Sequence, residues 1–232
     1  MAKPVPYHKG DIIKTKFCGD CKVVHYENSF NVTVKFLRTK YVKIVEAGQL
    51  RKGIVYDPYY PRVCGIGVVG EGKFSQSKSR KLYILWQNML KRCYDLTYQK
   101  RQPTYIGCTV VKRWHNFQNF CEDIIRMPNW NKKGFDLDKD LRVLGNKKYG
   151  PKYCSFVPRE INRAFTLFKI EITKKKDRYY ARWKGDRVGF STENQARVWK
   201  QNKIKEEISE LLMEYKGKLH IEVIKHLEER MI

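Results

Sequence analysis

The chain has 232 residues, with 48 lysines and arginines against 24 aspartates and glutamates, which gives a formal net charge of +24 at pH 7. This excess is far greater than solubility requires and indicates a polyanion as the partner. Because there is no run of about 18 apolar residues and no apolar signal core at the N-terminus, we expect a soluble cytoplasmic protein without a membrane partner.

Residues 1–75 are predicted to form a small, basic, β-barrel-like module. Four short runs of β-forming residues, at 11–15, 21–26, 31–36 and 41–45, are separated by turn sequences. Lysines and arginines alternate with apolar residues along these runs, so we expect one apolar face and one basic face. Lys35 and Lys40 are candidate DNA contacts on the basic face, and a merely solvated face is the alternative for each of them.

The glycine-rich segment CGIGVVGEGKF, at residues 64–74, contains a GxGxxG string. No strand, helix and acidic residue follow it in the order that a dinucleotide-binding fingerprint needs, so a flexible linker is the prediction.

The seven cysteines are odd in number and scattered in apolar surroundings, which indicates reduced and mostly buried thiols. Cys18 and Cys21 have the CxxC spacing of a zinc site but lack a second pair nearby, so two buried thiols on a hairpin are expected. A structural zinc site, which is less favoured than core packing, would involve Cys93, Cys108, Cys121 and Cys154.

Residues 76–166 begin with two predicted core helices. From Ser79 onward, apolar residues recur on one helical face while the opposite face is basic; the apolar set is Leu82, Leu85, Trp86, Met89, Leu90 and Cys93. A second helix over residues 116–125 buries Phe117, Phe120, Cys121 and Ile124. We expect both helices to support a hairpin at residues 135–157.

The most informative stretch, DLDKDLRVLGNKKYGPKYCSFVPREINRAF at residues 136–165, is predicted to form this hairpin and a short helix. Asp138 and Asp140 precede the turn, and Asn162 lies on the helix that follows Pro158. Carboxylate and amide oxygens are the ligands that a hard divalent cation such as Mg²⁺ or Mn²⁺ prefers. In the alternative interpretation, Asp138 accepts hydrogen bonds from backbone donors and Asn162 is merely exposed on its helix.

Residues 167–232 are predicted to form three strands, at 169–173, 179–183 and 188–190, followed by a helix that starts at Thr192 and a break at Gly217 before a last helix. The C-terminal hairpin within these three strands is strongly basic. A sheet of this kind can present arginines to base edges in a major groove. Arg182 and Arg187 are the candidates for base contacts, with a phosphate-only surface as the alternative. The aromatic residues of this C-terminal hairpin are expected in the core beneath the sheet. Its other candidate DNA contacts are Lys174, Lys175 and Arg178.

From Leu82 to Phe165 the chain resembles the HNH endonucleases found in phage and mobile-element genes, many of them homing endonucleases. The resemblance rests on order and spacing over residues 86–165, including Trp86, Arg92-Cys93-Tyr94, Leu137-Asp138-Lys139-Asp140, Cys154-Ser155-Phe156-Val157-Pro158 and Asn162. Residues 9–72 look like the basic β-module that precedes this core in such phage proteins. Residues 168–215 look like a degenerate Apetala-type DNA-binding domain.

The resemblance implies an α+β protein with a central ββα-metal core, and a metal-dependent endonuclease that cleaves or nicks double-stranded DNA in a phage-infected bacterial host. Asp138 and Asn162 match the metal ligands of the family, whereas Lys139 replaces its catalytic histidine. Lys139 itself, His115 and Asp140 are the candidates for the missing base. Further DNA contacts are expected at Lys147, Lys148 and Arg163. The alternatives are a catalytically impaired DNA-binding protein with a regulatory or architectural role, and an RNA or ribosome binder.

Overall fold

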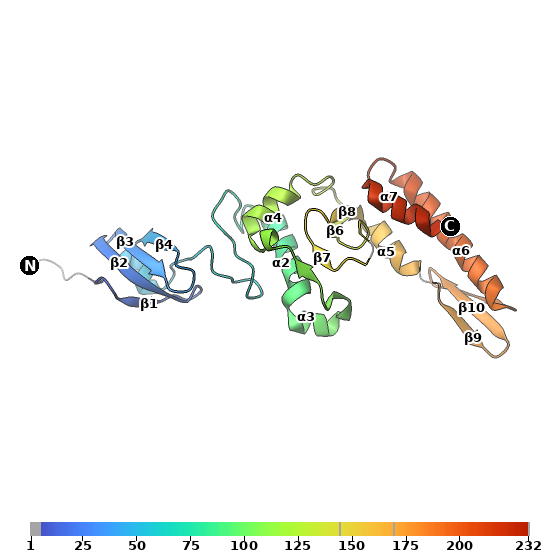
Figure 1. The fold of residues 1–232 in the computed structure, drawn as a ribbon, viewed down its shortest axis with the longest axis horizontal. Helices are drawn as coiled ribbons and strands as arrows, with labels where there is room; N and C mark the ends of the chain where they lie inside the picture. The colour runs from blue at the N-terminus through green and yellow to red at the C-terminus, as the bar shows by residue number, and fades with distance from the viewer. Residues whose placement is uncertain (1–5, 144, 169, 232) are drawn as a thin grey trace, which may run out of the picture. The chain divides into compact units, whose positions relative to one another are not determined.

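The computed structural model describes residues 6–143, 145–168 and 170–231, and the chain divides into two compact units, Met1–Glu122 and Asp123–Ile232 (Figure 1). Helices and strands are mixed along both units, which agrees with the α+β class. In the described part of the chain, no helix combines the length and the apolar character that crossing a membrane requires.

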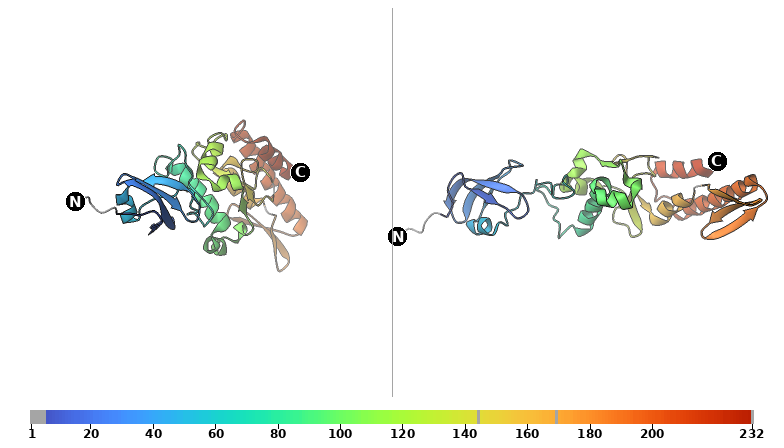
Figure 2. Two further views of the ribbon diagram at one scale, coloured as in Figure 1. Left: turned by 60° about the vertical axis from the view of Figure 1, so that its left-hand side comes forward. Right: turned by 90° about the horizontal axis from the view of Figure 1, so that it is seen from below.

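The first unit begins with an antiparallel sheet in the order β1-β2-β3-β4, drawn in blue in Figures 1 and 2. The strands span Ile12–Lys14, Asp20–Asn28, Asn31–Phe36 and Val42–Val45, so the four predicted runs are confirmed. Among the described residues the sheet is an open meander, and the expected barrel-like closure is not present. Helix α1 (Ala47–Lys52) follows, and it ends at Gly53, which has the left-handed conformation.

Alternate residues of this sheet are buried, with Cys21, Val23, Val32 and Val34 in the core. The opposite face is not uniformly basic, which corrects the expectation from the sequence. A row across all four strands pairs Ile12 with Lys22, Lys22 with Lys35, and Lys35 with Val42. Ile12 and Val42 are 62% and 50% exposed, so this face mixes lysines with solvent-exposed aliphatic side chains.

The glycine-rich segment packs tightly, so the prediction of a flexible linker is wrong. A Cβ atom on Gly67 would lie 2.5 Å from a methyl group of Leu90, and one on Gly70 would lie 2.7 Å from the Asn116 side chain. Val68 also pairs with the chain around Asn116, because its backbone N–H donates to the His115 carbonyl at 2.9 Å. The glycines are therefore small residues that allow close approach to the helices.

Two predicted core helices are confirmed as α2 (Arg80–Tyr94) and α4 (Phe117–Ile124). Between them lie α3 (Leu96–Arg101), β5 (Thr109–Val110), and the 3₁₀ helices η1 (Pro103–Tyr105) and η2 (Lys112–His115). Trp86 and Trp114 are completely buried, and the Trp86 indole Nε1 donates to the Trp114 carbonyl at 2.7 Å. This bond satisfies the one polar atom of a large buried ring.

In the second unit, β6 (Phe135–Asp138) pairs antiparallel with β8 (Ser155–Pro158), and α5 (Arg159–Leu167) follows directly. The short strand β7 (Lys148–Tyr149) lies between them in sequence. The predicted hairpin and short helix are thus confirmed. Strands β9 (Ile172–Lys175), β10 (Arg178–Trp183) and β11 (Asp186–Phe190) form a three-stranded antiparallel sheet, in the order β11-β10-β9. Lys169, the predicted start of the first of these strands, lies outside the described residues.

The chain continues with α6 (Glu193–Glu214), α7 (Ile221–Glu228) and the 3₁₀ helix η3 (Glu229–Met231). Thr192 caps α6 together with Gln195, and the predicted break lies between α6 and α7, where Gly217 has a φ of 71°. One apolar cluster, whose members include Leu141, Val157, Trp183 and Ile208, connects the hairpin with the sheet and these helices. The hairpin and the C-terminal elements therefore share one core.

All seven cysteines are free thiols, and six are buried while Cys64 is half-buried. The prediction of reduced, mostly buried thiols is confirmed. Burial raises the pKa of the Cys121 thiol to about 12, so this thiol stays protonated at neutral pH.

Candidate nucleic-acid interface and hairpin turn

The hairpin turn, which we define as residues 138–146, is organised by the carboxylate of Asp138. Asp138 ends β6 and is only 9% exposed. Its Oδ2 accepts hydrogen bonds from the backbone N–H groups of Asp140 at 2.7 Å and Leu141 at 2.6 Å. Aspartate side chains often close turns in this way, by bonding backbone donors two or three residues ahead. Burial raises the pKa of the Asp138 carboxyl despite these bonds.

Lys139 is buried in the same turn, at 5% exposure. Its ammonium forms an ion pair with Asp140 Oδ1 and donates to the Asn146 carbonyl at 3.2 Å. The Asn146 side chain holds the turn closed, since its Nδ2 donates to the carbonyls of Lys139 at 2.9 Å and Lys148 at 2.7 Å. A bonded ammonium has no lone pair with which to accept a proton from water, so this geometry does not make Lys139 a general base.

Asn162, the second predicted metal ligand, lies on α5 and lines a pocket of about 390 Å³ with Asp136, Arg159 and Arg163. Arg159 forms a bidentate ion pair with Asp136, at 2.9 Å from Nε to Oδ2 and 3.3 Å from Nη2 to Oδ1. The lining of this pocket does not include Asp138. The amide of Asn162 is therefore placed beside two guanidinium groups.

These donors do not fit a divalent cation. A hard cation takes six or more oxygen ligands, in most sites with several from the protein. Asp138 has one of its two oxygens bonded to backbone amides, Asp140 is paired with the Lys139 ammonium, and Asn162 faces Arg159 and Arg163. Within residues 6–143, 145–168 and 170–231, no three His, Cys, Asp or Glu side chains gather as a metal site needs.

His115 belongs to the first compact unit, whereas Asp138 belongs to the second. Its Nε2 lies 3.1 Å from the Val110 carbonyl and 3.3 Å from the Tyr94 hydroxyl, which in turn accepts from the Val110 N–H at 3.0 Å. Because a carbonyl only accepts, Nε2 carries the proton of the neutral ring. Burial lowers the pKa of His115. The imidazole thus joins two segments of its own unit.

The outer face of the C-terminal sheet, which we call the basic sheet face, consists of Lys175, Arg178, Tyr180, Arg182 and Arg187. Ala181 and Trp183 point the other way and are buried, so the alternation along β10 turns the residues between them outward. Arg182 and Arg187 are direct cross-strand partners and are both exposed.

The Tyr180 ring organises this face. The Arg187 guanidinium lies over the ring at 3.9 Å from its centroid, and Arg178 Nη2 donates to the Gly189 carbonyl at 3.2 Å. A Cβ atom on Gly189 would lie 2.9 Å from the ring, so glycine lets the ring lie flat against β11. Two arginines are thereby oriented before any partner binds. The expectation of core aromatics is correct for Trp183 and wrong for Tyr180.

Helix α6 supports the sheet from beneath. Lys200 is only 5% exposed, and its ammonium donates to the Arg182 carbonyl at 2.7 Å and lies 4.5 Å from the centroid of a Trp183 ring. Burial lowers the pKa of Lys200. Lys184, in the turn after β10, forms an ion pair with Glu207 of α6. Lys200 was not predicted as a contributor to this site, because a lysine on an amphipathic helix gives no indication that it is buried.

All ten predicted DNA contacts are exposed. Five belong to the C-terminal sheet, and the other five are Lys147 and Lys148 in the hairpin, Arg163 on α5, and Lys35 and Lys40 in the first unit. Exposure is what a phosphate contact requires, although any surface lysine meets this condition.

The described residues define an α+β protein with a closed, self-bonded hairpin turn and an open basic sheet face. No protein-family model matches the chain, and no curated protein or solved structure matches it either.

Proposed function

We propose that the protein binds double-stranded DNA through the basic sheet face, and that its HNH-like hairpin serves as a structural element and not as a catalytic centre. The observation that carries this proposal is the cross-strand pair of Arg182 and Arg187, exposed on a rigid sheet and placed in register. The Arg187 guanidinium lies over the Tyr180 ring, which orients it, and both guanidinium groups are exposed to a partner.

The chemistry of this face suits a duplex. A small β-sheet fits into the major groove, where arginine donates two hydrogen bonds to the edge of a guanine. Lysines at the edge of the sheet, such as Lys174 and Lys175, suit the phosphates on either side of the groove. The net charge of +24 supplies the long-range attraction that nonspecific DNA binding needs.

Phosphodiester hydrolysis makes demands that the hairpin turn does not meet. It needs a group that accepts a proton from water and a positive centre for the charge of the transition state. Lys139 stands where the family resemblance calls for a histidine, and its ammonium is already bonded to Asp140 and to the Asn146 carbonyl. The other candidate base, His115, uses its Nε2 within the first unit.

A metal-dependent endonuclease is the second candidate function, and one observation favours it. Asp138 Oδ1 makes no hydrogen bond among the described residues and is thus open to a ligand, at the end of a strand pair that leads into a helix. This ββα arrangement is what the resemblance to HNH endonucleases implies.

A plasmid assay distinguishes the two functions. Supercoiled DNA is incubated with the full chain in Mg²⁺, Mn²⁺ or EDTA, beside Asp138→Ala and Asn162→Ala variants, and duplex binding is measured in parallel by fluorescence anisotropy. We expect equal duplex binding in Mg²⁺ and EDTA and no metal-dependent nicking. Nicking that requires metal and is lost in both variants would establish the endonuclease instead.

A competition experiment tests the choice of duplex DNA over RNA. Structured RNA is titrated against a bound, labelled duplex at several salt concentrations. Retention of the duplex at moderate salt supports the proposal, because base contacts survive the screening that weakens phosphate contacts. Preferential displacement by RNA across the salt series would identify an RNA-binding protein.

A further inference from the structure

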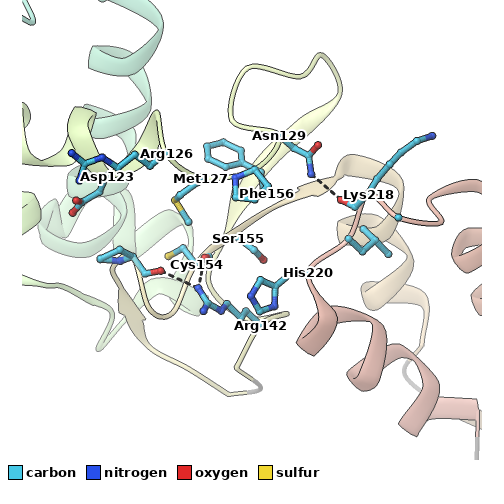
Figure 3. A pocket seen from close by; sticks show the side chains of 14 residues that line it. Asp123, Arg126, Met127, Asn129, Arg142, Cys154, Ser155, Phe156, Lys218 and His220 are labelled. Atoms are coloured by element: carbon cyan, nitrogen blue, oxygen red, sulfur yellow. Dashed lines mark hydrogen bonds between the residues drawn. The ribbon is translucent and has the colours of Figure 1, made fainter.

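A pocket of about 650 Å³ lies within the second unit, apart from the basic sheet face (Figure 3). Its walls come from residues 123–129, from the hairpin at Arg142 and residues 151–156, and from the loop at residues 217–220. The Asn129 side chain joins two of these walls, because its Nδ2 donates to the Lys218 carbonyl at 2.8 Å. The volume is within the range of pockets that hold small molecules, roughly 300–1,000 Å³.

One wall carries an unsatisfied hydroxyl. Ser155 is 7% exposed, and its Oγ is buried without a hydrogen-bond partner, the one such side-chain atom among the residues that the structure describes. Figure 3 shows its side chain at the pocket, between Phe156 and His220. Buried hydroxyls in native proteins almost always have a partner, so a missing ligand is a direct explanation.

The pocket is also electropositive. Arg126 and Arg142 outnumber Asp123, the one carboxylate among the residues that line it. The Lys218 side chain extends away from Ser155 (Figure 3), and its ammonium donates to the Glu214 carbonyl at 3.3 Å. Arg142 is held in place by its Nη1, which donates to the carbonyls of Pro151 at 2.9 Å and Cys154 at 3.3 Å. Its remaining N–H groups are free of hydrogen bonds to described residues, and a guanidinium fixed in this way is a preorganised receptor for an oxyanion.

His220 supplies a further donor. Its Nδ1 accepts from the Glu222 backbone N–H at 3.2 Å, so the neutral ring carries its proton on Nε2. Figure 3 shows the imidazole between Arg142 and the loop that contains Lys218. Met127, Phe156 and Leu219 provide an apolar part of the lining. The ligand that matches this lining has an anionic group beside a flat apolar group.

We propose that this pocket binds a nucleoside phosphomonoester, with its phosphate near Ser155 and Arg142 and its base against the apolar side chains. A free nucleotide and the phosphorylated end of a DNA strand share this chemistry. The pocket shares no residue with the basic sheet face, so this proposal does not rest on duplex binding.

Isothermal titration calorimetry on the full chain with dAMP, at about 150 mM salt to screen the general positive charge, tests the proposal. Ser155→Ala and Arg142→Lys change the pocket, whereas Arg197→Gln removes one exposed positive charge from α6, where Arg197 pairs with Glu193. We expect saturable binding that weakens roughly 10-fold to 150-fold in each pocket variant, as loss of one hydrogen bond to a charged group predicts. The Arg197 variant should bind as wild type does.

Two probes define the ligand, and two more define its source. Inorganic phosphate and deoxyadenosine should each bind much more weakly than dAMP, because each fills only part of the pocket. A 5′-phosphorylated single-stranded oligonucleotide that competes with dAMP, when its 5′-hydroxyl counterpart does not, identifies a DNA end as the source. Competition by neither oligonucleotide identifies the free nucleotide.

Three results would overturn the proposal. They are an absence of saturable dAMP binding, equal weakening in the Arg197→Gln control, and equal affinity for inorganic phosphate. Thermal unfolding of each variant shows whether it is folded. Arg142→Lys, which keeps a donor for the carbonyls of Pro151 and Cys154, decides the matter if Ser155→Ala is destabilised. Duplex binding is measured on the same samples, so a lack of duplex binding by the basic sheet face is distinguished from a lack of dAMP binding by the pocket.

Discussion

The hairpin turn and the basic sheet face are both rich in charge, but the fold uses that charge differently. In the turn, Lys139 is 5% exposed and its ammonium is bonded to Asp140 and to a backbone carbonyl. On the sheet, Arg182 and Arg187 project into solvent from a frame that Lys200 and Trp183 support from beneath. Charged groups whose partners are inside the fold stabilise it, whereas exposed groups on a rigid frame are available to another molecule.

The difference also has an energetic side. A buried charge without partners is unfavourable by several kcal/mol, so the turn depends on each of its hydrogen bonds. An exposed arginine contributes little to stability, and its removal usually changes the unfolding free energy by less than about 0.5 kcal/mol. Stability measurements and binding measurements should therefore separate the two regions.

The largest effect is expected from Asp138→Ala. This change removes the acceptor for the backbone N–H groups of Asp140 and Leu141, so the free energy of unfolding should fall by about 2–4 kcal/mol. Urea denaturation, followed by circular dichroism with and without Mg²⁺, measures the loss. Asp136→Ala is the matched control two residues earlier on β6, because its ion pair with Arg159 is about half exposed and should contribute less than about 1 kcal/mol.

The result with Mg²⁺ decides the meaning of this effect. If the turn is structural, the difference between wild type and Asp138→Ala is the same in Mg²⁺ and in EDTA. If Mg²⁺ stabilises the wild type and not the variant, Asp138 binds the cation, and the distinction between a closed turn and an open sheet face no longer holds.

An intermediate effect is expected on the sheet, and it concerns binding. Arg182→Gln and Arg187→Gln should each weaken duplex affinity by about 1–3 kcal/mol, or roughly 5-fold to 150-fold. The unfolding free energy should change by less than about 1 kcal/mol, the larger change being that of Arg187→Gln, which loses the contact with the Tyr180 ring. Fluorescence anisotropy across a salt series measures the affinity. A variant that also loses sequence discrimination identifies a base contact, and one that only reduces the salt slope identifies a phosphate contact.

Arg197→Gln is the control for this experiment, since it removes the same charge from an exposed position on α6. If all three variants lose the same small amount of affinity, the basic sheet face is no more important than the rest of a strongly charged surface.

Local patterns in the sequence predicted most of the secondary structure. Apolar residues on one helical face located α2 and α4, and the Thr192 cap located the start of α6, because these features depend on residues a few positions apart. The glycine-rich segment could not be predicted in this way. Whether Gly67 and Gly70 are flexible or packed depends on Leu90 and Asn116, which are distant in sequence.

The candidate sites show the same limit. Residue type and the resemblance to HNH endonucleases singled out Asp138, Lys139 and Asn162. The ion pair of Lys139 with Asp140 depends on burial of the turn, and the neighbours of Asn162 depend on how α5 packs. The pocket around Ser155 combines three separate segments, and the Cys154–Pro158 motif in one of them gives no indication of a cavity. The sequence contains residue types capable of chemistry, but the partners of those residues are set by the fold.

His115 extends the comparison to the first unit, and it gives the smallest expected effect. Its imidazole resembles the hairpin turn, in that its proton is donated within the fold to the Val110 carbonyl. Burial, and secondarily Lys112, lowers the pKa of His115 from its ordinary value of 6.5, although the bond to Val110 opposes this shift. As the pH falls below 6.5, the unfolded chain therefore gains a proton before the folded chain does. The contribution of the neutral ring to stability is complete above this pH and declines below it.

Urea denaturation between about pH 7.5 and pH 5.5 should show the wild type losing stability relative to His115→Gln. A His25→Gln variant, changed at an exposed position on β2, should follow the wild type. If stability instead rises toward low pH only when His115 is present, the ring is free to take up a proton in the folded protein, and its similarity to the hairpin turn no longer holds.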